Sequence, residues 1–202
     1  DDHDPVLHER DKPIRSFIAV NIPDLAKTAI DKAYAPLKEL MHGVKWVEAQ
    51  NLHITLKFLG HAEPHQLDLL KEKLSEVLSG ERKFQIRFSR IGVFPIMKDP
   101  KVIWLGLERG EEPLKNLAFK IEESSIQAGF QPESKSFSAH LTLGRAKDGQ
   151  RVKYPSNLLE SFRYASDGPI LIDHVELYQS ILTHHGPQYR PLWRFELHEN
   201  IQ

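Results

Sequence analysis

The order of strand-like and helix-like segments limits the fold of this chain more than any other feature. Segments in the order strand, helix, strand, strand occur more than once along the 202 residues, without regular βα alternation. This order predicts an α+β fold with antiparallel or mixed sheets flanked by helices, rather than a doubly wound parallel sheet. The predicted strands cover residues 14–21, 44–47, 52–59, 83–91, 101–108, 137–143, 170–180 and 189–197. The predicted helices cover residues 23–41, with a break at Pro36, then 63–79 and 112–128, and a short piece lies within 155–162.

The chain is long enough for one domain made of two packed lobes, and no Gly/Ser linker or low-complexity tract divides it. Residues 1–12 contain five acidic and two basic side chains and precede Pro13. We expect residues 1–12 to be a disordered or loosely attached leader. Residues 13–202 are then predicted to form a single bilobal domain.

Composition excludes several classes of protein. The sequence is 40% hydrophobic and 27% charged, as in soluble globular proteins, and no apolar run approaches the ~20 residues of a membrane span. Cysteine is absent, which removes disulfides, thiolate nucleophiles and cysteine-based zinc sites. We predict a cytoplasmic monomer without a signal peptide or membrane contact. With a formal net charge of −1, any anionic ligand must be held by a local site rather than by a basic face.

One tetrapeptide pattern occurs twice, as His53-Ile54-Thr55-Leu56 and as His140-Leu141-Thr142-Leu143. Each copy falls in a predicted strand, where alternate side chains share a face. The histidine and threonine of each copy should therefore lie side by side on an accessible face, with the two apolar residues in the core.

Two such strands facing each other across a cleft could open a cyclic phosphodiester. One imidazole takes a proton from water and the other gives a proton to the departing ribose oxygen, since a histidine pKa of about 6.5 permits either role. The hydroxyl groups can donate hydrogen bonds to the phosphate oxygens. This chemistry needs no metal and no cofactor. A single His-x-Thr is common by chance, however, so the pattern alone leaves the function open.

The motifs resemble those of a known family. Residues 15–20 (RSFIAV), 44–47 (VKWV), 51–60 (NLHITLKFLG), 94–95 (FP), 102–107 (VIWLGL), 137–145 (FSAHLTLGR) and 175–180 (VELYQS) are similar, in this order, to segments of the two-histidine (2H) phosphoesterase superfamily. Within it, the chain resembles the RNA 2',3'-cyclic phosphodiesterases once named 2'-5' RNA ligases. One departure is Ala139 where the family often has proline before the second histidine.

The resemblance implies two lobes related by a pseudo-twofold axis, each giving one His-x-Thr strand to a central cleft. By similarity, His53 protonates the leaving 3' oxygen and His140 activates water, which leaves a 2'-phosphate. The residues implied in substrate binding are Thr55, Thr142 and Arg145 for the phosphate and Phe58 for the nucleobase. Strand alternation places Phe58 on the opposite face from His53 unless the strand ends or twists.

The leading hypothesis is metal-independent hydrolysis of RNA 2',3'-cyclic phosphate ends, with weak reverse 2'-5' ligation by the same groups. The partner is then RNA with such an end, or a small cyclic nucleotide. Two alternatives stay open: a 2H phosphoesterase acting on another cyclic nucleotide or on 2'-5' oligoadenylate, and a non-catalytic module that binds RNA ends.

Other conspicuous side chains have plainer interpretations. His184 and His185 fall in a predicted turn between two strands and are expected to be exposed loop histidines rather than metal ligands. Trp46, Trp104 and Trp193 fall in strand-like segments and are expected in the core rather than as base-stacking platforms.

Overall fold

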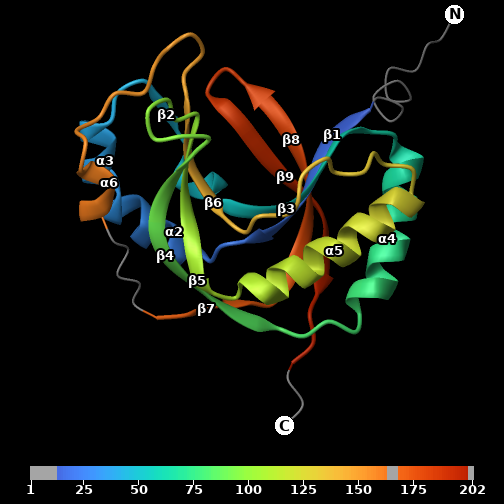
Figure 1. The fold of residues 1–202 in the computed structure, drawn as a ribbon. Helices are drawn as coiled ribbons and strands as arrows, with labels where there is room; N and C mark the ends of the chain where they lie inside the picture. Colours follow the sequence, from blue (N-terminus) through green and yellow to red (C-terminus); the bar gives the residue numbers. More distant parts are fainter. Residues whose placement is uncertain (1–12, 163–167, 200–202) are drawn as a thin grey trace, which may run out of the picture.

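The strands form two antiparallel sheets that face each other, as Figure 1 shows for the computed structural model of the chain. The structure describes residues 13–162 and 168–199. The predicted leader at residues 1–12 lies outside these described residues. None of the helices in the described ranges is long and apolar enough to cross a membrane.

The first sheet has the strand order β3-β1-β8-β9 and the second has the order β2-β6-β5-β4-β7. The strands of the first sheet are β1 (Ile14–Asn21), β3 (His53–Ala62), β8 (His174–Thr183) and β9 (Gly186–Glu196). The strands of the second sheet are β2 (Val44–Trp46), β4 (Phe84–Phe94), β5 (Val102–Arg109), β6 (Leu141–Ala146) and β7 (Ile170–Ile172). All pairs between these strands are antiparallel, which confirms the predicted fold class.

Helices lie on the outer side of each lobe. Figure 1 shows α4 and α5 together beside the first sheet, and α2, α3 and α6 together on the other side of the molecule. The helices are α2 (Asp24–Ala33), α3 (Ala35–Leu40), the 3-10 turn η1 (Ala49–Asn51), α4 (Pro64–Leu78), α5 (Glu111–Gln127) and α6 (Leu158–Ser161). The predicted break near Pro36 is confirmed, because α3 starts one residue before it and Tyr34 separates the two helices.

The apolar residues of the repeated pattern enter the core as predicted. Ile54 and Leu141 are fully buried, and Leu56 and Leu143 are nearly so. They belong to one continuous hydrophobic cluster that contains residues of both sheets. The period-two pattern therefore leaves His53, Thr55 and Thr142 on the opposite face, toward the space between the sheets.

Most predicted strands are found with ends shifted by at most three residues, and two predicted strands differ more than this. The strand predicted over 170–180 is interrupted at Asp173, because the chain leaves β4 of the second sheet there and joins β1 of the first. The strand predicted over 137–143 begins only at Leu141. His140 therefore precedes the strand instead of lying inside it. The carbonyl of Ser138 accepts a hydrogen bond from the His140 ring rather than from a neighbouring strand.

Candidate active site

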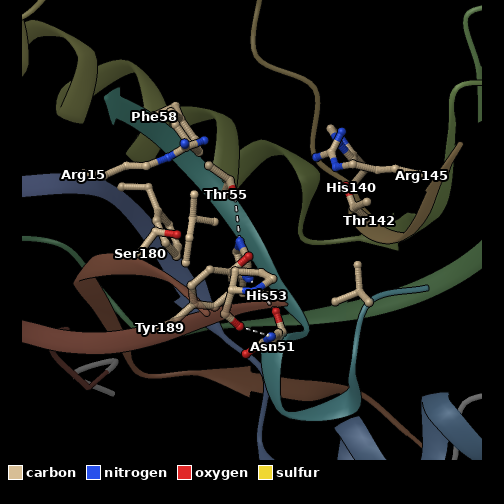
Figure 2. Close-up of a pocket in the computed structure, with 14 residues that line it drawn as sticks. Arg15, Asn51, His53, Thr55, Phe58, His140, Thr142, Arg145, Ser180 and Tyr189 are labelled. Carbon is tan, nitrogen blue, oxygen red and sulfur yellow. Dashed lines mark hydrogen bonds between the residues drawn. The ribbon is translucent and has the colours of Figure 1, made fainter. Parts of the chain in front are cut away.

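A cavity of about 390 Å³ lies between the two sheets and contains every site residue expected from the sequence. Figure 2 shows His53, Thr55 and Phe58 on one side and His140, Thr142 and Arg145 on the other. The lining residues come from both sheets, from the β2–β3 connection and, for His140, from the end of the α5–β6 connection: Arg15, Phe17, Val47, Asn51, His53, Thr55, Phe58, His140, Thr142, Arg145, Ser180, Leu182, Pro187 and Tyr189.

Two hydrogen bonds hold the His53 ring and determine which of its two nitrogens carries the hydrogen. Its Nδ1 lies 2.6 Å from the carbonyl oxygen of Asn51, and its Nε2 lies 2.9 Å from Oγ1 of Thr55. Because a carbonyl can only accept, Nδ1 carries the hydrogen. In the neutral ring Nε2 then accepts a hydrogen bond from the Thr55 hydroxyl, so histidine and threonine are side by side as the sequence predicts.

The surroundings of His53 favour its neutral form. Burial lowers the pKa of His53 from 6.5 to about 4, and the positive charges of Lys27 and Arg145 act in the same direction. The hydrogen bond to Asn51 opposes this shift of the pKa. The ring packs against Phe17, with 4.9 Å between ring centroids, and edge-on against Tyr189 at 5.1 Å. With this pKa, His53 is uncharged near neutral pH unless an anion binds beside it.

His140 repeats part of this arrangement. Its Nδ1 donates to the carbonyl oxygen of Ser138 at 2.8 Å, which like Asn51 is two residues before the histidine. Its Nε2 has no hydrogen-bond partner among the described residues. The two histidines thus share one local geometry, and the free Nε2 of His140 is the nitrogen available to a ligand or to water.

A β-bulge follows each His-x-Thr. In β3, Ile18 pairs with Lys57 and the next residue of β1, Ala19, pairs with Thr55, so Leu56 is an extra residue. In β6, Ile103 pairs with Gly144 and Trp104 pairs with Thr142, so Leu143 is the extra residue. A bulge of one residue reverses the alternation of side chains beyond it.

The two bulges decide which further side chains enter the cleft. Phe58 lies three positions after Thr55, and Arg145 three positions after Thr142, so simple alternation would turn both away. The bulges bring them back, and both line the cavity. Phe58 therefore faces the cleft, as the resemblance implies, because the bulge interrupts the simple alternation that would have turned it away from His53. Lys57 instead points into the protein, where it donates to the carbonyl oxygen of Gln131 and pairs with Glu122 at 2.8 Å.

The cavity is lined by arginine side chains but by no carboxylate. No aspartate or glutamate lines it, and its two arginines, Arg15 and Arg145, make no ion pair with any described residue. The guanidinium of Arg15 lies 5.6 Å from the ring centroid of Phe58, which gives a cation-π contact at the cavity wall. A chain with net charge −1 thus concentrates positive charge in one cleft.

Eight lining residues were missed by the sequence analysis: Arg15, Phe17, Val47, Asn51, Ser180, Leu182, Pro187 and Tyr189. The alternation of β1 could have identified Arg15 and Phe17, which share the face of β1 that continues the face of Thr55. No local pattern marks Tyr189, because its strand joins the site only through the sheet order β3-β1-β8-β9. Asn51 adjoins the first motif, and its side-chain amide donates to the carbonyl oxygen of Pro187 at 2.9 Å.

His184 and His185 form the two-residue turn between β8 and β9, and both are exposed. The predicted hairpin is therefore confirmed.

Trp46 packs against the core as expected, whereas Trp193 is 50% exposed and the expectation of a core position for it is wrong. In the part of the chain that the structure describes, no group of three or more histidine, cysteine, aspartate or glutamate side chains is placed to hold a metal ion.

Comparisons with known proteins agree with this architecture. A family profile described as LigT like phosphoesterase matches residues 20–104 and again residues 105–189, so each match contains one His-x-Thr. An RNA 2',3'-cyclic phosphodiesterase of Archaeoglobus fulgidus is 39% identical over 186 residues, which cover 91% of this chain and 100% of that protein. A protein of the same name from Aquifex aeolicus is 36% identical over 154 residues, or 76% of this chain and 81% of its own.

A solved structure shows the same fold. A protein of Thermus thermophilus superimposes with a TM-score of 0.76 at 24% identity, over 93% of this chain and 100% of its own. The repeated profile match and the relative that is 39% identical along its whole length show that the chain belongs to the LigT-like phosphoesterase family.

Proposed function

We propose that the protein hydrolyses 2',3'-cyclic phosphate ends of RNA to 2'-phosphate ends without a metal. The observation that carries this proposal is the meeting of two imidazoles, two threonine hydroxyls and Arg145 in one cavity that no carboxylate lines. The names of the Archaeoglobus fulgidus and Aquifex aeolicus relatives support the same reaction. An RNA 5'-hydroxyl in place of water would give weak 2'-5' ligation through the same groups.

In the proposed reaction His140 is the base. Its Nε2 takes a proton from a water molecule, whose oxygen attacks phosphorus, and the bond from phosphorus to the 3' oxygen breaks. Nε2 of His140 suits this role because no described residue forms a hydrogen bond with it, whereas Nδ1 donates to the carbonyl oxygen of Ser138. Arg145 and the hydroxyl of Thr142 hold the phosphate oxygens as negative charge increases on them.

His53 is proposed as the acid that gives a proton to the departing 3' oxygen. The low pKa of His53 in the free protein is compatible with this role because the substrate is an anion. A negative charge about 4 Å from the protonated ring, at an effective dielectric constant near 20, stabilises that ring by about 4 kcal/mol. This free energy raises the pKa of His53 by about three units. This increase offsets the effect of burial, which lowers the pKa of His53 to about 4, and lets His53 carry a proton once phosphate is bound. The Thr55 hydroxyl, no longer needed as a donor to Nε2, then becomes available to the phosphate.

Product analysis tests the reaction. A short RNA ending in 2',3'-cyclic phosphate is incubated with the protein and excess chelator, and the position of the product phosphate is determined. We expect a 2'-phosphate. A strict requirement for an added divalent metal would contradict the mechanism, and a 3'-phosphate product would reverse the orientation assigned to the ring. Binding without turnover would favour the non-catalytic RNA-end-binding module.

A substrate with sulfur in place of the 3' oxygen tests the two roles separately. A thiolate leaves without needing a proton, so this substrate should restore most of the rate lost in His53→Ala. It should restore little in His140→Ala, because water still has to be deprotonated. The opposite pattern of rescue would exchange the acid and the base. Comparison with 2'-5' oligoadenylate and with cyclic mononucleotides tests the other substrates.

A further inference from the structure

Trp104 lies on the cleft-facing side of the second sheet, directly opposite Thr142 in the pairing of β5 with β6. Its ring does not pack against the buried core, although its neighbours Ile103 and Leu105 are fully buried there. The expectation that Trp104 is a core residue is therefore wrong. The side chain is half-buried on the same face as a phosphate-binding candidate.

The indole ring lies flat on the backbone of β4. A Cβ atom at Gly92 would be 2.1, 2.3 and 2.6 Å from three consecutive carbon atoms of the ring, which places it over the ring face rather than at the edge. Gly92 is the residue paired with Trp104. A glycine is therefore required here for the ring to lie against the sheet.

The same face continues to Phe94. Phe94 pairs with Val102, which in turn pairs with Arg145, so these three residues form a row across β4, β5 and β6. Phe94 is 52% exposed, although it is a large apolar side chain. The ammonium group of Lys135 lies 5.4 Å from its ring centroid and makes no ion pair with any described residue.

We propose that Trp104, Phe94 and Lys135 form a platform for the single-stranded RNA on the 5' side of the terminal cyclic phosphate. Aromatic faces that stack bases, together with cations that track the backbone, are how proteins bind single strands. The proposal rests on the proposed function, and it adds that the preferred substrate is an oligonucleotide rather than a mononucleotide.

The geometry gives the direction of the RNA chain. Strands are about 4.8 Å apart, so Trp104 lies about one strand spacing from Thr142, and Phe94 about two from Arg145. In the other direction along the same row, β2 presents Lys45, and the space beside it is bounded by Gly186, Pro187 and Tyr189 of β9. The aromatic rings of Trp104 and Phe94 and the ammonium group of Lys135 all lie toward β5 and β4, so the proposed path of the RNA runs over these two strands.

The test compares two substrates, adenosine 2',3'-cyclic phosphate and an adenosine trinucleotide with the same end. The wild type should have the higher kcat/KM for the trinucleotide. Phe94→Ala should lower kcat/KM for the trinucleotide by about fivefold to 100-fold, the range for loss of one stacking aromatic ring, and leave the mononucleotide within about twofold. Trp104→Leu should have the same effect. Lys135→Ala should reduce the slope of log K against log salt for trinucleotide binding by about 0.7.

Lys45→Ala is the matched control, since it removes one lysine from the other end of the same row. The platform is excluded if the wild type shows no preference for the trinucleotide, or if Phe94→Ala slows both substrates equally. It is also excluded if Lys45→Ala, and not Lys135→Ala, reduces the salt slope. If Trp104→Leu fails to fold, the exposed residues Phe94 and Lys135 still decide the outcome. Failure of the proposed function would look different, because the wild type would then not hydrolyse the mononucleotide either.

Discussion

Thr142 and Arg145 lie on the same face of β6 although they are an odd number of residues apart, because Leu143 is an extra residue in the ladder with β5. Leu56 has the same role between Thr55 and Phe58 in β3. Each lobe therefore presents a histidine, a threonine and one larger side chain, in the order His-x-Thr-x-x-Phe and His-x-Thr-x-x-Arg. The aromatic ring comes from one lobe and the guanidinium from the other.

Replacing either histidine should remove most of the turnover. Each proton transfer is worth about 10²–10⁴-fold, so we expect losses of that size in His53→Ala and in His140→Ala. The double variant should be far less than multiplicatively worse, because the two groups act in one transition state. Steady-state kinetics on the RNA substrate measures this. The control is His184→Ala, an exposed turn histidine that should behave like the wild type. Near-full activity of either single variant, with the fold intact, would rule out the paired assignment.

Binding of inorganic phosphate should raise the pKa of His53. In the free protein, burial holds this pKa at about 4, so the ring stays neutral as the pH is lowered through 6.5 toward 4. A phosphate anion in the cleft favours the charged ring, so binding takes up a proton and becomes tighter as the pH falls through that window. Titration of the ring by NMR, with and without phosphate, measures the shift. His53→Gln should abolish the proton uptake, and an unchanged pKa in saturating phosphate would contradict the acid role.

Asn51 should act as a positioning residue for His53. Its carbonyl oxygen accepts from the ring, and its side-chain amide ties η1 to Pro187 at the start of β9. Asn51→Ala removes the hydrogen bond to Pro187, so the carbonyl group of residue 51 is free to move. We therefore expect kcat to fall by roughly 10-fold to 100-fold with little change in KM. The ring tautomer of His53, observed by ¹⁵N NMR, should become mixed. Gln50→Ala is the control, because this exposed neighbour bonds only to Glu48 through its side chain. A kcat equal to that of the control would show that Asn51 has no positioning role.

Arg145 should account for a measurable part of the salt dependence of RNA binding. With a net charge of −1, we expect a shallow dependence overall, equivalent to one to three phosphate contacts at about 0.7 in slope for each. Arg145→Gln should weaken binding and lower the slope by about 0.7. Arg82→Gln, which removes an exposed arginine that does not line the cleft, should leave the slope unchanged. A wild-type slope that requires six or more contacts would indicate a much longer RNA track.

The sequence by itself determined the fold class and the chemical groups of the site. Period-two alternation around His53 and His140 was enough to assign the core residues Ile54, Leu56, Leu141 and Leu143, because a strand places neighbours on opposite faces whatever it pairs with. The same local rule placed Thr55 beside His53. Monomeric state and a cytoplasmic location stay predictions.

Only the tertiary structure decided the rest of the cleft. The bulges at Leu56 and Leu143 depend on the register with β1 and β5, which lie far away in sequence, so alternation alone placed Phe58 on the wrong face. The proximity of Tyr189 and Trp104 to the site likewise follows from sheet order and cross-strand pairing. The low pKa of His53 arises from burial and from charges on other segments. Local sequence sets the direction of a side chain relative to its neighbours, whereas long-range pairing decides which side chains meet.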